Sequence, residues 1–274
     1  MHGVRLLVLA VAAALLPASV TAQVAADSST PPPPAFSVVE LRRFAFVGLL
    51  GAAAYAGDAA VRDGVQASGP QGNAVLDGLA EFGNAWGQPG VVGLGLAMWG
   101  GGLLAKRPIV ASSGLRAIEA ITVSGAVTKL LKGSFGRARP YVAPNDRTDW
   151  QLFRGFGHSN GEYEAMPSGH ATAAFAFAAA VTGEVAHRAP AHARWVGIAT
   201  YSAAAVTAYA RVHDDRHWLS DVTVGAGVGT VTGLAIVRWH ATRPNNVIDR
   251  WLLAPILAPS PSGGWTLGLR VSPR

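Results

Sequence analysis

The chain has 274 residues, half of them apolar and only 14% charged, with a formal net charge of +6. It contains no cysteine, which excludes disulfides, thiolate catalysis and zinc–thiolate sites. The basic residues are scattered rather than interleaved with aromatic residues, which argues against nucleic-acid binding. The content of Ala, Val, Leu and Gly is typical of closely packed helices, either in a membrane or in a compact helical protein.

Residues 1–22 have the layout of a secretory signal peptide. Arg5 precedes an apolar run over 6–16, and small residues follow as far as Ala22. An uncleaved membrane anchor is the alternative, and both interpretations take the chain out of the cytoplasm. Residues 23–40 contain four consecutive prolines, which predict a stiff polyproline spacer.

Six apolar stretches follow, and none alternates with period two, so their Ala and Leu content predicts helices. They cover residues 41–61, 89–105, 114–132, 169–187, 195–211 and 218–239. The predicted fold class is therefore all-α, a bundle of about six apolar helices in a domain of residues 41–243. The tail, 244–274, has a Pro/Ser/Gly turn between two apolar segments and is expected to form a short β-hairpin.

The composition of the helices leaves their relation to a membrane open. Their lengths approach the roughly 20 residues that span a bilayer, but Asp58, Glu119 and Glu184 place charge inside them. We expect membrane association, with a soluble periplasmic bundle as the alternative. Counting Lys and Arg at the junctions puts the long polar segment 133–167 outside the cytoplasm. Six membrane spans after a cleaved signal peptide would instead put this segment inside the cytoplasm. We therefore expect either that the 41–61 segment does not cross the membrane fully, or that the whole helical domain is periplasmic.

The densest group of charges is RVHDDRHWLSD, residues 211–221. His217 and Asp221 are four apart, so on a helix that begins near residue 217 they share one face. The carboxylate can then accept the Nδ1 proton and leave the Nε2 lone pair free, which suits a base or a nucleophile. Taken alone, the pair is better explained as an ion pair at a helix start.

The other residues of this stretch are expected to be peripheral. Asp214 and Asp215 are interpreted as solvated loop charges, because no third carboxylate is spaced to complete a metal site. His213 is expected to be exposed.

Two further motifs stand at the ends of apolar stretches. In MPSGH, Ser168 is a good N-cap, Gly169 lets a ligand approach the backbone, and His170 would point at an anion bound there. A plain helix cap with a surface histidine is the alternative. In KGSFGRARP, Lys132 and Arg139 are costly to bury without an anion. A positive flank at a membrane boundary explains this motif as well.

In this order, the three motifs resemble the tripartite signature of the type 2 phosphatidic acid phosphatase (PAP2) superfamily, which also holds class A acid phosphatases and vanadium haloperoxidases. The resemblance rests on Lys132-x6-Arg139-Pro140, Pro167-Ser168-Gly169-His170 and Arg211-x5-His217-x3-Asp221, within residues 110–240. One departure is Ala210, where the third motif usually has serine; it puts a supporting hydrogen bond in doubt and not the chemistry.

The resemblance implies phosphoryl transfer through a phosphohistidine. His217 would be the nucleophile, Asp221 its orienting carboxylate, and His170 the acid that protonates the leaving oxygen. The phosphate oxygens would be held by Lys132, Arg139, Ser168, Gly169 and Arg211. No metal or other cofactor is implied; vanadate would be an inhibitor or, in a haloperoxidase, a cofactor. Arg137 and Arg216 are then flanking residues of lesser importance.

We therefore expect an exported phosphatase that acts on phosphomonoester or pyrophosphate groups, foremost of lipids, at the periplasmic face of the inner membrane or in the periplasm. The alternatives are a soluble acid phosphatase with broad small-molecule substrates, a vanadium haloperoxidase, and a non-catalytic membrane scaffold. The complete set of site residues argues against the scaffold. The aromatic loop 141–165 either packs onto the helices or forms an apolar lip for a lipid tail.

Overall fold

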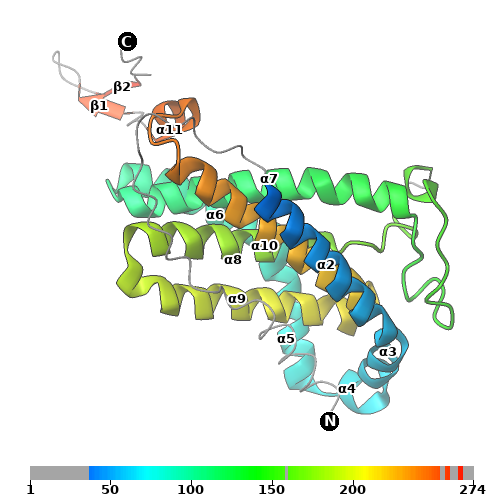
Figure 1. Ribbon diagram of the computed structural model, residues 1–274. Helices are drawn as coiled ribbons and strands as arrows, with labels where there is room; N and C mark the ends of the chain where they lie inside the picture. The colour runs from blue at the N-terminus through cyan, green and yellow to red at the C-terminus, as the bar shows by residue number, and fades with distance from the viewer. Residues whose placement is uncertain (1–36, 158–159, 254–256, 260–264, 268–274) are drawn as a thin grey trace.

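The computed structural model describes residues 37–157, 160–253, 257–259 and 265–267, which form an all-α bundle with a small C-terminal strand pair (Figure 1). The helices are α2 (Val38–Ala56), α3 (Asp58–Gln66), α4 (Ser68–Gln71), α5 (Ala74–Ala85), α6 (Val91–Leu104), α7 (Pro108–Phe135), α8 (Gly169–Arg188), α9 (Pro190–His213), α10 (Leu219–Ala241) and α11 (Val247–Leu252). A π-helical turn, Trp86–Gly90, joins α5 to α6, and a 3₁₀ turn, Arg154–Phe156, lies in the loop between α7 and α8. The predicted fold class is confirmed.

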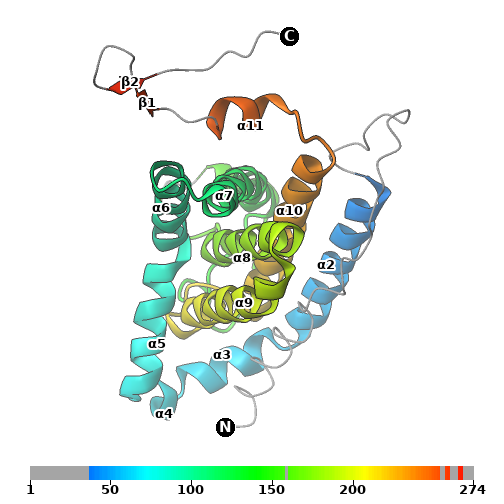
Figure 2. The ribbon, with the colours of Figure 1, turned by 90° about the vertical axis from the view of Figure 1, so that its left-hand side faces the viewer.

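Helix α8 lies at the centre of the bundle. It packs against α7, α9 and α10, and the end-on view in Figure 2 shows it enclosed by these three helices. Every residue from Ala171 to Thr182 is buried, and most of them are alanine. Alanine favours the helix and leaves room for neighbours on all sides. Helices α2, α5 and α6 form an outer layer against α10, α9 and α7 respectively.

A row of glycines brings α10 close to α8. Gly225, Gly229 and Gly233 are four residues apart and therefore lie on one face. A Cβ at Gly225 would lie 2.6 Å from the Ser168 carbonyl oxygen, and one at Gly233 would lie 2.8 Å from the Ala176 carbonyl oxygen. Only glycine permits this approach, which packs α10 from its second turn onward closely along α8.

Each of the six predicted stretches contains a helix, but some of the bounds differ. The 41–61 stretch is broken at Gly57, where α2 and α3 meet at 57°. The start of α9 at Pro190 is earlier than predicted, with proline at the first helical position, where its missing N–H costs nothing. Helix α5 was not predicted, because it falls between two of the apolar stretches. The segment 133–167 is a long loop, as expected.

One described helix, α10, is long and apolar enough to cross a membrane, and α2 with α3 makes a second if the bent pair is one span. The apolar window of α10 is 72% buried inside the bundle, which is equally typical of a core helix in a soluble protein. Membrane association therefore stays an expectation at this point. The predicted signal peptide and the predicted spacer as far as residue 36 lie outside the described residues.

The predicted hairpin in the C-terminal tail is present. Strand β1 (Leu257–Pro259) pairs antiparallel with β2 (Trp265–Leu267), with Leu257 opposite Leu267. The preceding helix α11 is held to the bundle in part by Trp99, whose indole N–H donates to the Leu252 carbonyl at 2.8 Å. The strand pair thus follows a helix that is itself anchored to α6.

Candidate active site

The three motifs meet at one end of the bundle, beside the loop drawn on the right of Figure 1. Helices α7 and α9 end there, and α8 and α10 begin there, because successive helices run in opposite directions. The structure brings together every site residue that the sequence predicted: Lys132, Arg139, Ser168, Gly169, His170, Arg211, His217 and Asp221.

Backbone contacts hold the motifs to one another. The Ser168 N–H donates to the Asp221 carbonyl oxygen at 3.0 Å, which joins the start of α8 to the first turn of α10. The His217 N–H donates to the Arg211 carbonyl oxygen at 3.1 Å, so the chain folds back tightly between α9 and α10. A Cβ at Gly169 would lie 3.8 Å from Cε of Lys132. These contacts bring the three motifs together at one place.

Ser168 occupies the N-cap position of α8, but its hydroxyl does not cap the helix. The residue is fully buried, and Oγ has no hydrogen-bond partner among the described residues. The expectation of a side-chain cap was therefore wrong in its detail. An unpaired buried hydroxyl is costly, and a helix start offers free backbone N–H groups beside it. Together they suit an anionic oxygen.

Lys132 and Arg139 are held by backbone carbonyls. The Lys132 ammonium donates to the Glu164 carbonyl oxygen, and Arg139 donates through Nε to the Gly161 carbonyl oxygen at 2.7 Å. Neither cation has an ion pair with a carboxylate within the described part of the chain. Carbonyl groups orient a cation without neutralising its charge, so the charge stays available to an anion.

Arg211 is positioned by a residue that the sequence did not indicate. Its Nη1 lies 2.5 Å from Oδ1 of Asn84, at the end of α5. Asp214 is the nearest carboxylate, at 3.7 Å from the same nitrogen, and it accepts a hydrogen bond from Asn84 at 2.7 Å. Asn84 therefore fixes both the arginine and the carboxylate that partly balances it.

Burial lowers the pKa of all three cations. The pKa of Lys132 falls to about 7, mainly because the ammonium is dehydrated and also because Arg139 repels it. The pKa of Arg211 falls to about 10, and that of Arg139 falls as well, again chiefly through burial. Removal of water from three like charges costs free energy. An anion bound among them would offset that cost.

Both histidines are uncharged in this environment. Burial, reinforced by Arg211, Lys132 and Arg139, lowers the pKa of His170 to about 4. Burial and the same three cations hold the pKa of His217 well below its ordinary value. Nδ1 of His217 lies 3.6 Å from Oδ2 of Asp221, too far for a hydrogen bond but close enough for the carboxylate to attract a charge on the ring. A neutral imidazole backed by a carboxylate can act as a nucleophile.

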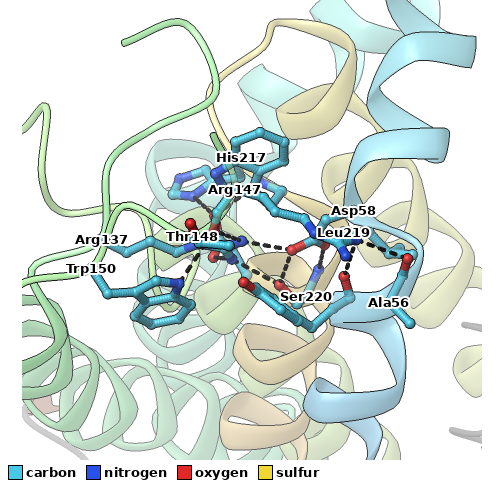
Figure 3. A network of polar contacts seen from close by, with 12 residues as sticks. Ala56, Asp58, Arg137, Arg147, Thr148, Trp150, His217, Leu219 and Ser220 are labelled. Carbon is cyan, nitrogen blue, oxygen red and sulfur yellow. Dashed lines mark hydrogen bonds and ion pairs between the residues drawn. The ribbon is translucent and has the colours of Figure 1, made fainter. Parts of the chain in front are cut away.

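The carboxylate of Asp221 is itself held by Arg137. Oδ1 accepts from Nη1 of Arg137 at 2.7 Å, and Oδ2 accepts from the Trp218 backbone N–H at 2.8 Å. The second amino group of Arg137 donates to Asp58 at 2.6 Å (Figure 3). Arg137 is only 1% exposed. The interpretation of Arg137 as a flanking residue was therefore wrong, because a flank would face solvent or headgroups and this guanidinium lies between two buried carboxylates.

The sequence model of the PAP2 superfamily matches residues 113–245, which include all three motifs. Residues 113–245 belong to the PAP2 superfamily. The resemblance inferred from the motifs is confirmed.

Two relatives illustrate the match. The PAP2 chain is 34% identical over 113 residues to the lipid A 1-phosphatase of Porphyromonas gingivalis; these residues are 41% of this chain and 20% of that protein. The chain thus matches about a fifth of the length of this curated relative. A crystal structure of a transmembrane PAP2 type phosphatidylglycerolphosphate phosphatase from Bacillus subtilis superposes with a TM-score of 0.53 at 19% identity, covering 72% of this chain and 93% of that one. That likeness confirms the PAP2-type fold.

Apart from Arg137, the residues that sequence reasoning missed come from outside the three motifs. Asp58 and Asn84 lie on α3 and α5, and Gly87 lies in the π-helical turn. A Cβ at Gly87 would lie 2.6 Å from Cδ2 of His170, so the imidazole packs directly on this glycine. One signal was available: Asp58 in an apolar stretch and Arg137 in a motif are opposite charges that a core would have to pair.

Two further expectations about 211–221 are corrected. His213 is 7% exposed, and its Nε2 lies 3.3 Å from Asp77. Asp215 is paired with Arg62 of α3, at 2.7 Å, and is therefore not a solvated loop charge. Asp214 is exposed, as expected, and accepts a hydrogen bond from Asn84. These contacts connect the turn after α9 to α3 and α5, because those N-terminal helices fold over the turn.

The aromatic residues of the long loop divide into two groups. Trp150 contacts the site although it is 37% exposed, with its ring centre 4.5 Å from the Arg137 guanidinium and 6.0 Å from that of the Phe135 ring. Leu152, Phe153 and Phe156 are 71%, 65% and 59% exposed. The loop of this PAP2 protein thus packs onto the site and also leaves apolar side chains exposed; the lip for a lipid tail stays a prediction.

Proposed function

We propose that this PAP2 protein is a phosphatase that hydrolyses phosphomonoester or pyrophosphate groups of lipids through a phosphohistidine, with its site at the periplasmic face of the membrane. One observation carries the proposal. Three cations have no full carboxylate partner among the described residues: Lys132, which is buried, and Arg139 and Arg211, which are partly buried. They face two neutral imidazoles, one of which is backed by a buried aspartate. Phosphoryl transfer needs this kind of positioning and charge stabilisation.

The chemistry follows from the positions of the side chains. His217 attacks phosphorus, and Asp221 stabilises the positive charge that develops on the ring. The cations, with the Ser168 hydroxyl and the Gly169 N–H, hold the phosphoryl oxygens. The bound dianion offsets the repulsion that keeps His170 neutral, so its pKa rises when substrate binds. His170 can then protonate the leaving oxygen and later deprotonate the water that hydrolyses the phosphohistidine.

A lipid substrate is supported by two facts. The loop beside the site exposes Leu152, Phe153 and Phe156, an apolar surface next to a phosphate cradle. The two PAP2 relatives are named for lipid A and phosphatidylglycerolphosphate. We infer that a lipid chain lies along this loop while the headgroup enters the site. Vanadate, a tetrahedral oxyanion like phosphate, would bind the same residues and inhibit in competition with substrate.

Phosphate release tests the activity and the substrate class together. The full chain in detergent is assayed with a lipid A phosphate, a phospholipid monoester, a lipid pyrophosphate, and soluble phosphates with matching headgroups, all with a metal chelator present. We expect the chelator to have no effect and the lipids to have the higher kcat/KM. His217→Ala is the inactive control. Faster turnover of the soluble phosphates would favour a broad acid phosphatase, and no release from any substrate would overturn the proposal.

Sidedness is tested separately. The chain has no cysteine, so Asn145→Cys, at an exposed loop position, gives a single label site. We expect a membrane-impermeant maleimide to label it in cells whose outer membrane alone is permeabilised. Labelling only after the inner membrane is opened would place the site in the cytoplasm.

A further inference from the structure

A buried polar chain runs from α3 to the proposed nucleophile (Figure 3). It begins at Asp58, the first residue of α3, which is fully buried. Oδ1 of Asp58 accepts from the Ser220 backbone N–H at 2.8 Å, and Oδ2 accepts from the Ser220 hydroxyl at 2.7 Å and from Arg137 at 2.6 Å. Both carboxylate oxygens are therefore used to fix groups that adjoin the site.

Arg137 is the centre of the chain. Nη1 donates to Asp221 at 2.7 Å and to the Ser220 hydroxyl at 2.8 Å, while Nη2 donates to Asp58 and to the Arg147 carbonyl oxygen. Aromatic rings surround the guanidinium, with the nearest, Trp150, at 4.5 Å and Tyr55 and Trp218 each at 5.3 Å. Lysine cannot replace this residue fully, because an ammonium group lacks the planar shape and the paired N–H donors of the guanidinium.

We propose that Arg137 and Asp58 are positioning residues of this site: Arg137 keeps the Asp221 carboxylate ionised and aimed at His217, and Asp58 holds Arg137 in place. This inference rests on the proposed phosphatase function and deepens it. Arg137 can position the Asp221 carboxylate only if its own guanidinium is held in place. Asp58 holds it by accepting a hydrogen bond from Nη2, while Nη1 donates to Asp221. Asp58 lies on α3, outside the three motifs.

The charges of the two residues act on Asp221 in opposite directions. Burial raises the pKa of Asp221 to about 6, Arg137 lowers that pKa, and Asp58 raises it. The other charged or titratable groups that face this carboxylate are His217, Lys132 and Arg139. Since a protonated Asp221 cannot stabilise a charged His217, activity should be lost as pH falls through the pKa of Asp221. This loss of activity at low pH is the acid limb of the pH–activity profile. Loss of Arg137 should move the acid limb to higher pH, and loss of Asp58 should move it to lower pH.

The experiment compares Arg137→Gln, Arg137→Lys and Asp58→Asn in the full chain. With an aryl phosphate as substrate, we expect Arg137→Gln to lower kcat by about 10²-fold, the scale of a misplaced catalytic group. KM should stay within about threefold, because Lys132, Arg139 and Arg211 still hold the phosphate. Arg137→Lys should return the acid limb toward its original pH without restoring kcat. Asp58→Asn should lower kcat by about tenfold and shift the acid limb to lower pH.

Two measurements separate positioning from folding. Vanadate binding and thermal unfolding report whether each variant keeps its site and fold. Arg62→Gln is the matched control, because it removes another α3 ion pair, to Asp215, that does not reach Asp221. We expect this control to keep kcat and the pH profile.

The outcomes are distinct for the two proposals. An inactive wild-type chain would overturn the phosphatase function and this inference with it. An active wild type whose Arg137 and Asp58 variants keep kcat, or shift the acid limb in the same direction, would overturn the inference alone. A loss of kcat that merely follows the loss of vanadate binding would also overturn it, since the residues would then be structural.

Discussion

The bundle has a buried polar cluster at each end, and the two differ in how their charges are matched. The far cluster lies where α7 begins and α10 ends. There Arg116, only 2% exposed, pairs with both oxygens of Asp249 on α11, at 2.7 and 2.8 Å. His240 contacts Glu119 at 2.7 Å and Asp249 at 3.2 Å. Arg116 and His240 thus each have a carboxylate partner. At the candidate active site, Lys132 and Arg139 instead donate to backbone carbonyl oxygens.

The contrast extends to the histidines. Burial acts to lower the pKa of His240, but its hydrogen bonds to Asp249 and Glu119 outweigh burial and raise it. At the site, cations reinforce burial and bring the pKa of His170 to about 4. Burial of charge is therefore common to a structural ion network and to a ligand site. The imbalance of charge distinguishes them, because only an unbalanced cluster gains from binding an anion.

The largest expected effect is at His217. His217→Ala should lower turnover by on the order of 10⁴-fold or more, because no phosphoenzyme forms without the nucleophile. His170→Ala should still phosphorylate itself from a nitrophenyl phosphate, whose leaving group needs no proton, and then stall. Quench-flow with labelled substrate and mapping of the acid-labile phosphate measure both.

The control for these variants is His240→Gln in the far cluster, which should phosphorylate and turn over normally once folded. Label on His170, or phosphorylation that survives His217→Ala, would refute the assignment of nucleophile and acid.

Next in size is a loss of stability at the far cluster. Arg116→Ala leaves Asp249 and Glu184 without their buried partner, so it should lower the free energy of unfolding by about 3–5 kcal/mol. Denaturant unfolding measures this change. Activity per folded molecule should be unchanged, and a specific loss of kcat would show that the far cluster is not purely structural.

A smaller effect, and the reverse pattern, is expected at Arg139. Arg139→Ala should lower kcat/KM by about 10²–10³-fold, as for the loss of one preorganised charge donor. The free energy of unfolding should be equal or higher, since a dehydrated cation that repels Lys132 has been removed. Arg216→Ala is the neighbouring control and should matter much less. Equal losses from the two variants would mean that the phosphate is not held at Arg139.

The smallest expected effect is the pH dependence of the far cluster. The pKa of Asp249 is held below its ordinary value of 3.8, so its contribution is complete above that pH and lost as pH falls further. The pKa of His240 is raised above 6.5, so its contribution is complete below 6.5 and lost as pH rises through the raised value. Between pH 6 and 9 the wild type should lose about 1 kcal/mol more stability than His240→Gln. Parallel pH profiles of thermal unfolding would contradict this.

The sequence by itself determined the main helices of the bundle, though not α5 or the break at Gly57, and the identity of the motif residues. Apolar stretches without period two, ended by Gly and Pro, can only bury their surface as packed helices, and motif spacing is a local property of the chain. His217 and Asp221 are four residues apart, and such spacing places two side chains on one face whatever the rest of the fold does. The prediction that MPSGH forms a helix start beside an anion site likewise rested only on neighbouring residues in the chain.

Only the tertiary structure decided which groups are paired across the bundle. Arg137 and Asp58 are 79 residues apart, and their ion pair exists because the chain bends at Gly57 and lays α3 against the start of α10. Asn84 reaches Arg211 for a similar reason, since α5 packs on α9. No spacing rule connects such residues. A charge in an apolar sequence shows that a partner must exist, but the packing of the helices chooses the partner.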